Sequence, residues 1–164
     1  MAQTDLRKYG TEERLGKMDL DVISITPTCD ADATGNNEVI FDFFEIPYAG
    51  SVPGGSCLLH SIQLLDGDHH AGKIDLVFAT ASTTLGSTTI SLSDADAQNI
   101  LGYTTIEDYF DGVAFEMATV TNLGLAMKCA SGTTSLYVAG VNRSGGSLNY
   151  TTDKLHLKLG IVKD

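Results

Sequence analysis

The chain contains one segment whose glycine and lysine spacing could bind phosphate. Residues 67–73 read GDHHAGK, with the two glycines and the lysine placed as in a phosphate-binding loop. Such a loop needs a Ser or Thr after the lysine to hold magnesium, but Ile74 follows here. Asp68 would repel a phosphate, and the next residues alternate as a strand does instead of opening a helix. We therefore predict an ordinary surface loop.

The same loop carries two adjacent histidines beside two carboxylates, which are side chains that bind divalent metals. His69 and His70 follow Asp66 and Asp68 closely in the sequence. Adjacent residues in an extended loop point in opposite directions, so the two imidazoles cannot readily share one ion. We predict a solvated loop and no metal.

An aspartate-rich turn resembles the opening of a calcium loop. Residues 30–35 read DADATG, and Asp30, Asp32 and Asn36 offer oxygen ligands. The position near the end of such a loop that requires a bidentate glutamate is occupied here by Phe41, within a run typical of a core strand. We expect a turn whose side chains bond their own backbone, with a weak, non-standard calcium site as the alternative.

No residues are arranged as a nucleophile with its base. The chain has no Gly-x-Ser-x-Gly elbow, and Cys57 followed by His60 offers no base on the same face. A cupin-like metalloenzyme would need histidines that converge from facing strands, and only His60 and His156 stand at strand positions. We predict that the protein is not an enzyme and has no cofactor.

The three cysteines do not indicate a disulfide framework. Their number is odd, and none forms a Cys-x-x-Cys pair. Cys57 and Cys129 lie in strand-like runs and are expected to be buried thiols. Cys29 lies in a polar turn, where it could be exposed.

Composition and charge limit the class of protein. The 164 residues suit one domain, and 43% hydrophobic with 19% charged residues is typical of a globular chain. A net charge of −11 repels phosphate backbones, so we expect no nucleic-acid partner. No apolar run approaches the length of a membrane span, and Met1 to Gly16 is too polar for a signal peptide. We expect no membrane partner and synthesis in a cytoplasm.

From residue 19 onward the sequence alternates between β-rich runs and turns. Runs typical of strands occupy residues 19–26, 38–46, 56–66, 73–80, 122–128, 135–141 and 154–161. In the last run, every second residue from Leu155 to Ile161 is aliphatic, which predicts one buried face. The run at 38–46 is apolar on both faces, as in a strand covered on each side. A short glycine-containing loop favours a hairpin between runs 56–66 and 73–80.

One short helix is predicted at residues 93–102, which read SDADAQNILG. Ser93 can cap the first turn, Asp96 stands at a capping-box spacing, and Gly102 can end the element. At about two turns the helix decorates a sheet and does not build a core.

About eight modest strands and one helix predict an all-β fold. Strands far apart in the sequence must pair for the apolar faces to be covered. A two-sheet antiparallel sandwich, jelly-roll-like and with one short helix, meets this requirement as a single domain over residues 18–164.

Residues 1–17 carry mixed charges without an apolar period and predict an N-terminal arm. The arm is either disordered or becomes ordered on a neighbouring protein. In the second case its contacts with the partner are expected from Leu6, Arg7, Tyr9 and Leu15.

Several distinctive segments lie between about Cys57 and the end of the chain. They are SIQLLDGDHHAGKIDLVFATASTTLGS, SLSDADAQNILG, an aspartate-rich turn at residues 105–111, TNLGLAMKCASGTTSLYVAGVNRSGG and the terminal KLHLKLGIVKD. Together they resemble a family of small structural proteins, head decoration or cement proteins, of marine tailed bacteriophages. These segments describe strands and turns and carry no catalytic signature.

The resemblance implies a non-enzymatic virion component on the outer surface of a tailed-phage capsid, made in the host cytoplasm. Its partners would be the major capsid protein and other copies of itself, as a dimer or trimer at a symmetry axis of the shell. Strong negative charge would keep many copies soluble before assembly.

The chief alternative is a carbohydrate- or receptor-binding β-sandwich of a virion appendage. Such sites present aromatic platforms beside polar groups. The chain has no Trp, and its candidate aromatics Tyr48, Tyr103, Tyr109 and Tyr150 are scattered among loops.

Overall fold

The computed structural model describes residues 19–163, except positions 31, 33, 87 and 88. Nine strands and one short helix follow one another along these residues. They are β1 (Asp19–Ile25), β2 (Val39–Ile46), β3 (Ser56–Asp66), β4 (Ile74–Ala79), α3 (Asp94–Ala97), β5 (Ile100–Ile106), β6 (Tyr109–Asp111), β7 (Glu116–Lys128), β8 (Leu136–Asn142) and β9 (Leu155–Lys163).

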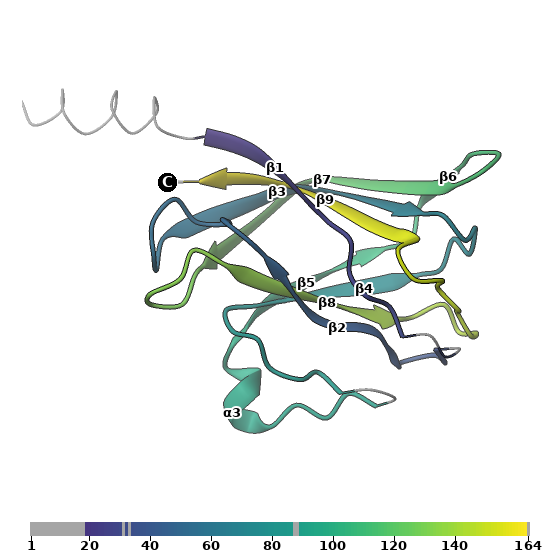
Figure 1. Ribbon diagram of the computed structural model, residues 1–164, viewed down its shortest axis with the longest axis horizontal. Helices are drawn as coiled ribbons and strands as arrows, with labels where there is room; N and C mark the ends of the chain where they lie inside the picture. The colour runs from purple at the N-terminus through teal and green to yellow at the C-terminus, as the bar shows by residue number, and fades with distance from the viewer. Residues whose placement is uncertain (1–18, 31, 33, 87–88, 164) are drawn as a thin grey trace, which may run out of the picture.

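The strands form two antiparallel sheets packed face to face (Figure 1). The five-stranded sheet has the order β1-β9-β3-β7-β6, and the four-stranded sheet has the order β2-β8-β4-β5. Without the three-residue β6, each sheet holds four strands that are far apart in sequence, in the order of a jelly roll. The predicted all-β, two-sheet antiparallel sandwich with one short helix is therefore confirmed.

The core lies between the two sheets and follows the period of two. Leu155, Leu157, Leu159 and Ile161 of β9 are fully buried, as their spacing predicts. They pack with the inward side chains of β3 and β4, such as Leu64 and Leu76. This burial of aliphatic side chains is the main stabilising term of the fold.

The predicted hairpin between residues 56–66 and 73–80 is wrong. β3 belongs to the five-stranded sheet and β4 to the four-stranded sheet, so the loop at residues 67–73 crosses between the layers. The cause is the buried Asp66, whose carboxylate accepts hydrogen bonds from the backbone N–H groups of Asp68, His70 and Ala71 at 2.8, 2.8 and 3.2 Å. These bonds fold the loop into a corner that leads to the other sheet, whereas a hairpin turn would return the chain to the same sheet.

The helix begins as predicted but ends earlier. Ser93 caps α3, with its hydroxyl oxygen accepting from the Asp96 N–H at 3.1 Å. Gly102 does not end this helix, because it lies within strand β5, which pairs with β4. One turn of helix gains few hydrogen bonds, whereas pairing Ile100–Ile106 with β4 satisfies a whole row of backbone groups.

The α-helical part of the described chain is the four-residue α3 alone. Accordingly, the residues described here include no helix with the length and apolar character needed to cross a membrane.

Candidate functional site

Part of the outer face of the four-stranded sheet is covered by the chain itself. The segment between β4 and β5, which includes α3, runs below this sheet in Figure 1. Leu85 of that segment is buried against Val39, Ala139 and Val141, whose side chains point away from the central core. The carboxylate of Asp42 in β2 accepts a hydrogen bond from the Leu85 N–H at 2.8 Å and holds the segment in place.

The outer face of the five-stranded sheet carries no such cover among the described residues. Directly paired residues of antiparallel strands lie on the same face, so the register defines rows of outward side chains. Four rows make up what we term the open face: Leu20, Val162, Leu58 and Ala126; Val22, Gly160, Ser61 and Thr121; Ser24, Lys158, Gln63 and Thr119; and His156, Leu65, Met117 and Phe110.

The first and the last of these rows are largely apolar. Leu20 and Val22 of β1 are 59% and 60% exposed, and Phe110 of β6 is 64% exposed. Val162 lies beside Leu20, Leu58 lies beside Val162 on the next strand, and both are half-buried. Leu20, Val22 and Val162 form one apolar group, and the polar row of Ser24 and Lys158 separates it from Phe110. Contiguous exposed apolar side chains on a folded surface are typical of a protein–protein contact.

The open face is also free of carboxylates, although the chain has 21 Asp and Glu residues. Its only ionisable side chains are Lys158 and His156. The imidazole Nδ1 of His156 is hydrogen-bonded to the Thr26 hydroxyl at 2.9 Å. These residues and their neighbours on β1 and β3 line a shallow hollow of about 340 Å³. The face is therefore apolar to weakly basic on an otherwise acidic molecule.

The sequence prediction missed the open face, although β1 held a signal for it. Leu20 and Val22 alternate with acidic residues, whereas Ile23 and Ile25 stand on the opposite face of the strand. Ile25 is buried in the core, so the first half of the strand presents its aliphatic side chains to solvent. A change of apolar face within one strand is a detectable sequence pattern.

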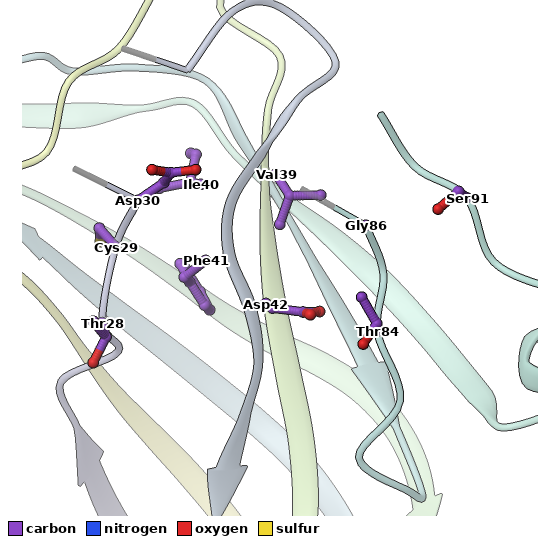
Figure 2. A pocket seen from close by; sticks show the side chains of 10 residues that line it. All are labelled: Thr28, Cys29, Asp30, Val39, Ile40, Phe41, Asp42, Thr84, Gly86 and Ser91. Carbon is purple, nitrogen blue, oxygen red and sulfur yellow. The ribbon is translucent and has the colours of Figure 1, made fainter. Parts of the chain in front are cut away.

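A second hollow, of about 470 Å³, lies beside the outer edge of β2 (Figure 2). Its polar side chains are those of Thr28, Asp30, Asp42, Thr84 and Ser91. Asp42 is already engaged by two backbone N–H groups, those of Phe43 and Leu85. These groups include no paired acid and base, so the hollow carries no assignable chemistry.

Cys29 lines the same hollow but is buried, contrary to the exposed position considered from the sequence. Burial raises the pKa of its thiol to about 12, and the carboxylates of Asp68, Asp66 and Asp153 add to this shift. A thiol in this state is a poor nucleophile at neutral pH. Cys57 and Cys129 are buried thiols in strand-like surroundings, as predicted.

In the structure, the polar side chains in and next to the GDHHAGK loop bind different partners and do not converge on one site. Asp66 is saturated by backbone N–H groups, and Asp68 accepts from the Thr151 N–H at 2.6 Å. The Nε2 atom of His70 is hydrogen-bonded to the Asn149 carbonyl at 2.8 Å, and its ring makes an edge contact with Tyr150 at 5.1 Å. His69 points elsewhere, so the two imidazoles do not share a site.

His69 instead lies near two carboxylates that sequence reasoning did not connect with it. Its ring and the carboxylates of Asp111 and Glu116 place one potential ligand atom each within 4.8 Å of one another. Asp111 and Glu116 are a directly paired position of the β6–β7 hairpin. Their distance in sequence from residue 69 hid the group.

The aspartate-rich turn is held by its own hydrogen bonds. Asp30 Oδ1 accepts from the Asp32 N–H at 3.1 Å, and Asn36 Oδ1 accepts from the Gly145 N–H at 3.2 Å. The side chains of this turn thus bond to backbone, as expected for the structural interpretation of the motif.

Neither predicted histidine of a cupin-like site lies in the interior. His60 stands at an irregularity of β3 and is half-buried, and His156 lies on the open face. The two side chains do not converge on one point with other ligands in the described part of the molecule.

Two of the four tyrosines considered for a carbohydrate platform are unavailable. Tyr150 is buried, and burial raises its pKa. The Tyr109 hydroxyl donates to the Gly72 carbonyl at 2.8 Å. Tyr48 and Tyr103 are exposed. Tyr48 lies on the turn after β2 and Tyr103 on β5, and these two strands are the opposite edges of the four-stranded sheet. Leu6, Arg7, Tyr9 and Leu15 of the predicted arm lie outside the described residues.

Comparisons with known proteins complete the description. No family model and no curated protein sequence match the chain. Among solved structures, it is similar to the capsid of Ralstonia phage GP4, with 18% identity, coverage of 91% of this chain and 86% of that chain, and a TM-score of 0.37. It is also similar to an Israeli acute paralysis virus particle protein, with 15% identity, coverage of 99% and 78%, and a TM-score of 0.33.

A third similarity is to the K3 cleaved adhesin domain of Lys-gingipain from Porphyromonas gingivalis. The identity is 15%, the coverage is 86% of this chain and 72% of that chain, and the TM-score is 0.32. The structures therefore include viral particle proteins and a bacterial adhesin domain. At such low TM-scores and identities, none of these similarities decides the function.

Proposed function

We propose that this protein is a non-enzymatic virion structural protein that decorates the outer surface of a tailed-phage capsid, and that it binds the major capsid protein through the open face. The observation that carries the proposal is the difference between the two sheets. One outer face is partly covered by the chain itself, whereas the four rows of the other include two largely apolar rows and no carboxylate.

The fold is compatible with this role but does not select it, because jelly rolls occur in capsid and lectin domains and in cupins alike. The sequence resemblance of residues 57–164 to phage decoration proteins favours the first of these classes. A surface without negative charge can approach an acidic or neutral shell, while the acidic remainder of the chain faces solvent and keeps free copies apart.

Binding at a junction between capsid subunits would stabilise the assembled shell by mass action, since only the assembled state offers the complete site. The shell repeats each junction by symmetry, so a dimer or trimer of this protein on a symmetry axis would match it. Both the contact with the capsid and the self-association are parts of the proposal.

Co-sedimentation with empty shells tests the open face. The double variant Leu20→Asp, Val22→Asp puts two charges on neighbouring positions of β1 in the first two rows of the open face, and we expect binding to weaken by about tenfold or more, as for hot-spot contacts of an interface. Tyr103→Asp is the matched control, because Tyr103 is 69% exposed on β5 of the other sheet. Equal binding by the double variant and the wild type would remove the open face from the proposal.

A separate truncation tests the predicted arm. Deletion of residues 1–16 removes Leu6, Arg7, Tyr9 and Leu15, and we expect weaker binding to the shell with a nearly unchanged melting temperature. Unchanged binding would assign the whole contact to the sandwich. A glycan array with the full chain addresses the rival carbohydrate-binding function, and specific capture of a glycan would favour that rival.

A further inference from the structure

A group of three metal-ligand side chains lies at one end of the sandwich, where Asp111 and Glu116 follow and precede the open-face residues Phe110 and Met117 and alternate to the other side of the hairpin. Here β3 ends, the loop at residues 67–73 crosses to the other sheet, and the β6–β7 hairpin turns. The turn is closed by the Gly112 N–H donating to the Phe115 carbonyl at 2.8 Å. Two separate connections of the chain therefore meet at this end.

The corner around Asp66 fixes the direction of His69. Three backbone N–H groups of the loop converge on the Asp66 carboxylate, and the ring of the next histidine is held by the Asn149 carbonyl. His69 itself has a φ of 58°, in the left-handed region that most side chains avoid. The loop thus presents the His69 ring toward the hairpin.

The hairpin contributes two carboxylates that stand directly opposite each other. Asp111 pairs with Glu116 across β6 and β7, and Glu116 pairs with the buried Asp66 across β7 and β3. Like charges at directly opposed positions destabilise a sheet. A row of three carboxylates on three adjacent strands is therefore unfavourable unless a positive charge lies beside it.

An independent observation also points to a missing partner at this place. The Oε2 atom of Glu116 is shielded from solvent and has no hydrogen-bond donor in the part of the chain that the structure describes. A buried carboxylate oxygen without a donor is costly, by more than a neutral group would be. A cation bound to this oxygen would remove both the repulsion and the unsatisfied acceptor.

We propose that His69, Asp111 and Glu116 bind one divalent cation of the zinc class, and that the ion fastens the β6–β7 hairpin to the inter-sheet corner. One imidazole and two carboxylates are a ligand set that Zn²⁺ accepts, with water in the fourth position. The three ligand atoms lie within 4.8 Å of one another, whereas ligands of one Zn²⁺ are about 3.3 Å apart at zinc–ligand distances near 2.1 Å. His69 and Asp111 are exposed, so rotation of their side chains can close this difference.

The inference does not depend on the proposed capsid contact, since the three ligands do not belong to the open face. The role of the ion is structural: it adds a second link between the hairpin and the loop at residues 67–73, which the hydrogen bond from the Tyr109 hydroxyl to the Gly72 carbonyl already joins. Binding to the folded state alone would raise the stability of that state.

Isothermal titration of the full chain with ZnCl₂ in metal-free buffer tests the site. The wild type should take up one Zn²⁺ and gain in melting temperature. His69→Asn suits the left-handed backbone while removing the imidazole, and Glu116→Gln preserves size while removing the charge. We expect each to weaken binding by about tenfold or more. His70→Gln is the control, and its binding should equal that of the wild type.

NMR of the wild-type imidazoles provides a measurement that needs no variant. Addition of Zn²⁺ should shift the ring signals of His69 and leave those of His70, His60 and His156 nearly unchanged. Absence of binding by the wild type, undiminished binding by both His69→Asn and Glu116→Gln, or equal weakening by His70→Gln would each overturn the proposal.

Discussion

The two sheets of this protein both carry apolar side chains on their outer faces, but they expose them to solvent to different extents. The four-stranded sheet buries one face against the core, and Leu85 and its segment cover part of the other face, on which Tyr103 remains exposed. The five-stranded sheet buries one face and leaves Leu20, Val22 and Phe110 in solvent. In a single small sandwich the first arrangement stabilises the fold, whereas the second keeps a surface for a partner. The following predictions test this division, beginning with the largest expected effect.

Removing the cover of the four-stranded sheet should destabilise the protein. Leu85→Ala empties the space over Val39 and Val141, and we expect a loss of about 2 to 4 kcal/mol in the free energy of unfolding. Urea denaturation measures this loss. An effect below about 0.5 kcal/mol, the size typical of surface substitutions, would mean that the segment does not act as part of the core.

A matched pair of glycines compares the two layers directly. A Cβ on Gly140 of β8 would overlap the buried ring of Phe41, and a Cβ on Gly160 of β9 would overlap the Ser61 hydroxyl on the open face. The ring cannot move without disturbing the core, whereas the hydroxyl can rotate into solvent. We expect Gly140→Ala to lose about 1 to 3 kcal/mol and Gly160→Ala clearly less. Thermal denaturation of both variants measures these losses in stability. Equal losses would contradict the difference between the two sheets.

Charging the open face should leave the fold intact. The side chains of Leu20 and Val22 are mostly in solvent already, so Leu20→Asp and Val22→Asp should each change the free energy of unfolding by no more than about 0.5 kcal/mol. Chemical denaturation of the two variants checks this. A large loss would show that these residues belong to the core and would remove the reason to regard them as a contact surface.

The smallest effect concerns the inner side of the same edge strand. The Lys163 ammonium donates to the Asp21 carboxylate at 2.8 Å, and this bond and charge hold the pKa of that carboxyl below its ordinary value of 3.8. The native state then binds its proton less readily than the unfolded chain. The stabilising contribution is present above pH 3.8 and is lost as the pH falls through the lowered pKa.

NMR titration of the Asp21 carboxyl should therefore give a pKa below 3.8 in the wild type and a value near 3.8 in Lys163→Met. An identical titration of Asp21 in both proteins would contradict the assignment of this shift to the ion pair.

The alternation of side chains predicted much of the sandwich. The period of two from Leu155 to Ile161 gave a buried face of β9, and the two apolar faces of residues 38–46 gave a strand covered on both sides. Local capping chemistry predicted the start of the helix at Ser93. β5 and β6 were missed, because the predicted helix took in the first residues of β5 and the three residues of β6 are too few to show an alternation.

Long-range contacts decided the remaining features. Asn142 follows the predicted run 135–141, and its side chain is buried and donates to the carbonyl groups of Thr34 and Gly146 at 2.7 and 2.8 Å. The direction of the chain after Asp66 depends on three backbone N–H groups that converge on one carboxylate. Neither arrangement has a periodic sequence pattern, because each depends on the hydrogen bonds of one side chain.

The sequence by itself determined which side chains must leave water, and therefore an all-β sandwich whose strands pair over long distances. It could not determine which of the two outer faces would be covered, because the covering segment reads as an ordinary loop with a short helix. It also could not bring His69 together with Asp111 and Glu116, because β4, α3 and β5 lie between them in the sequence. The hydrophobicity of each side chain decides whether it is buried. Which side chains become neighbours on the surface depends on how the whole chain folds.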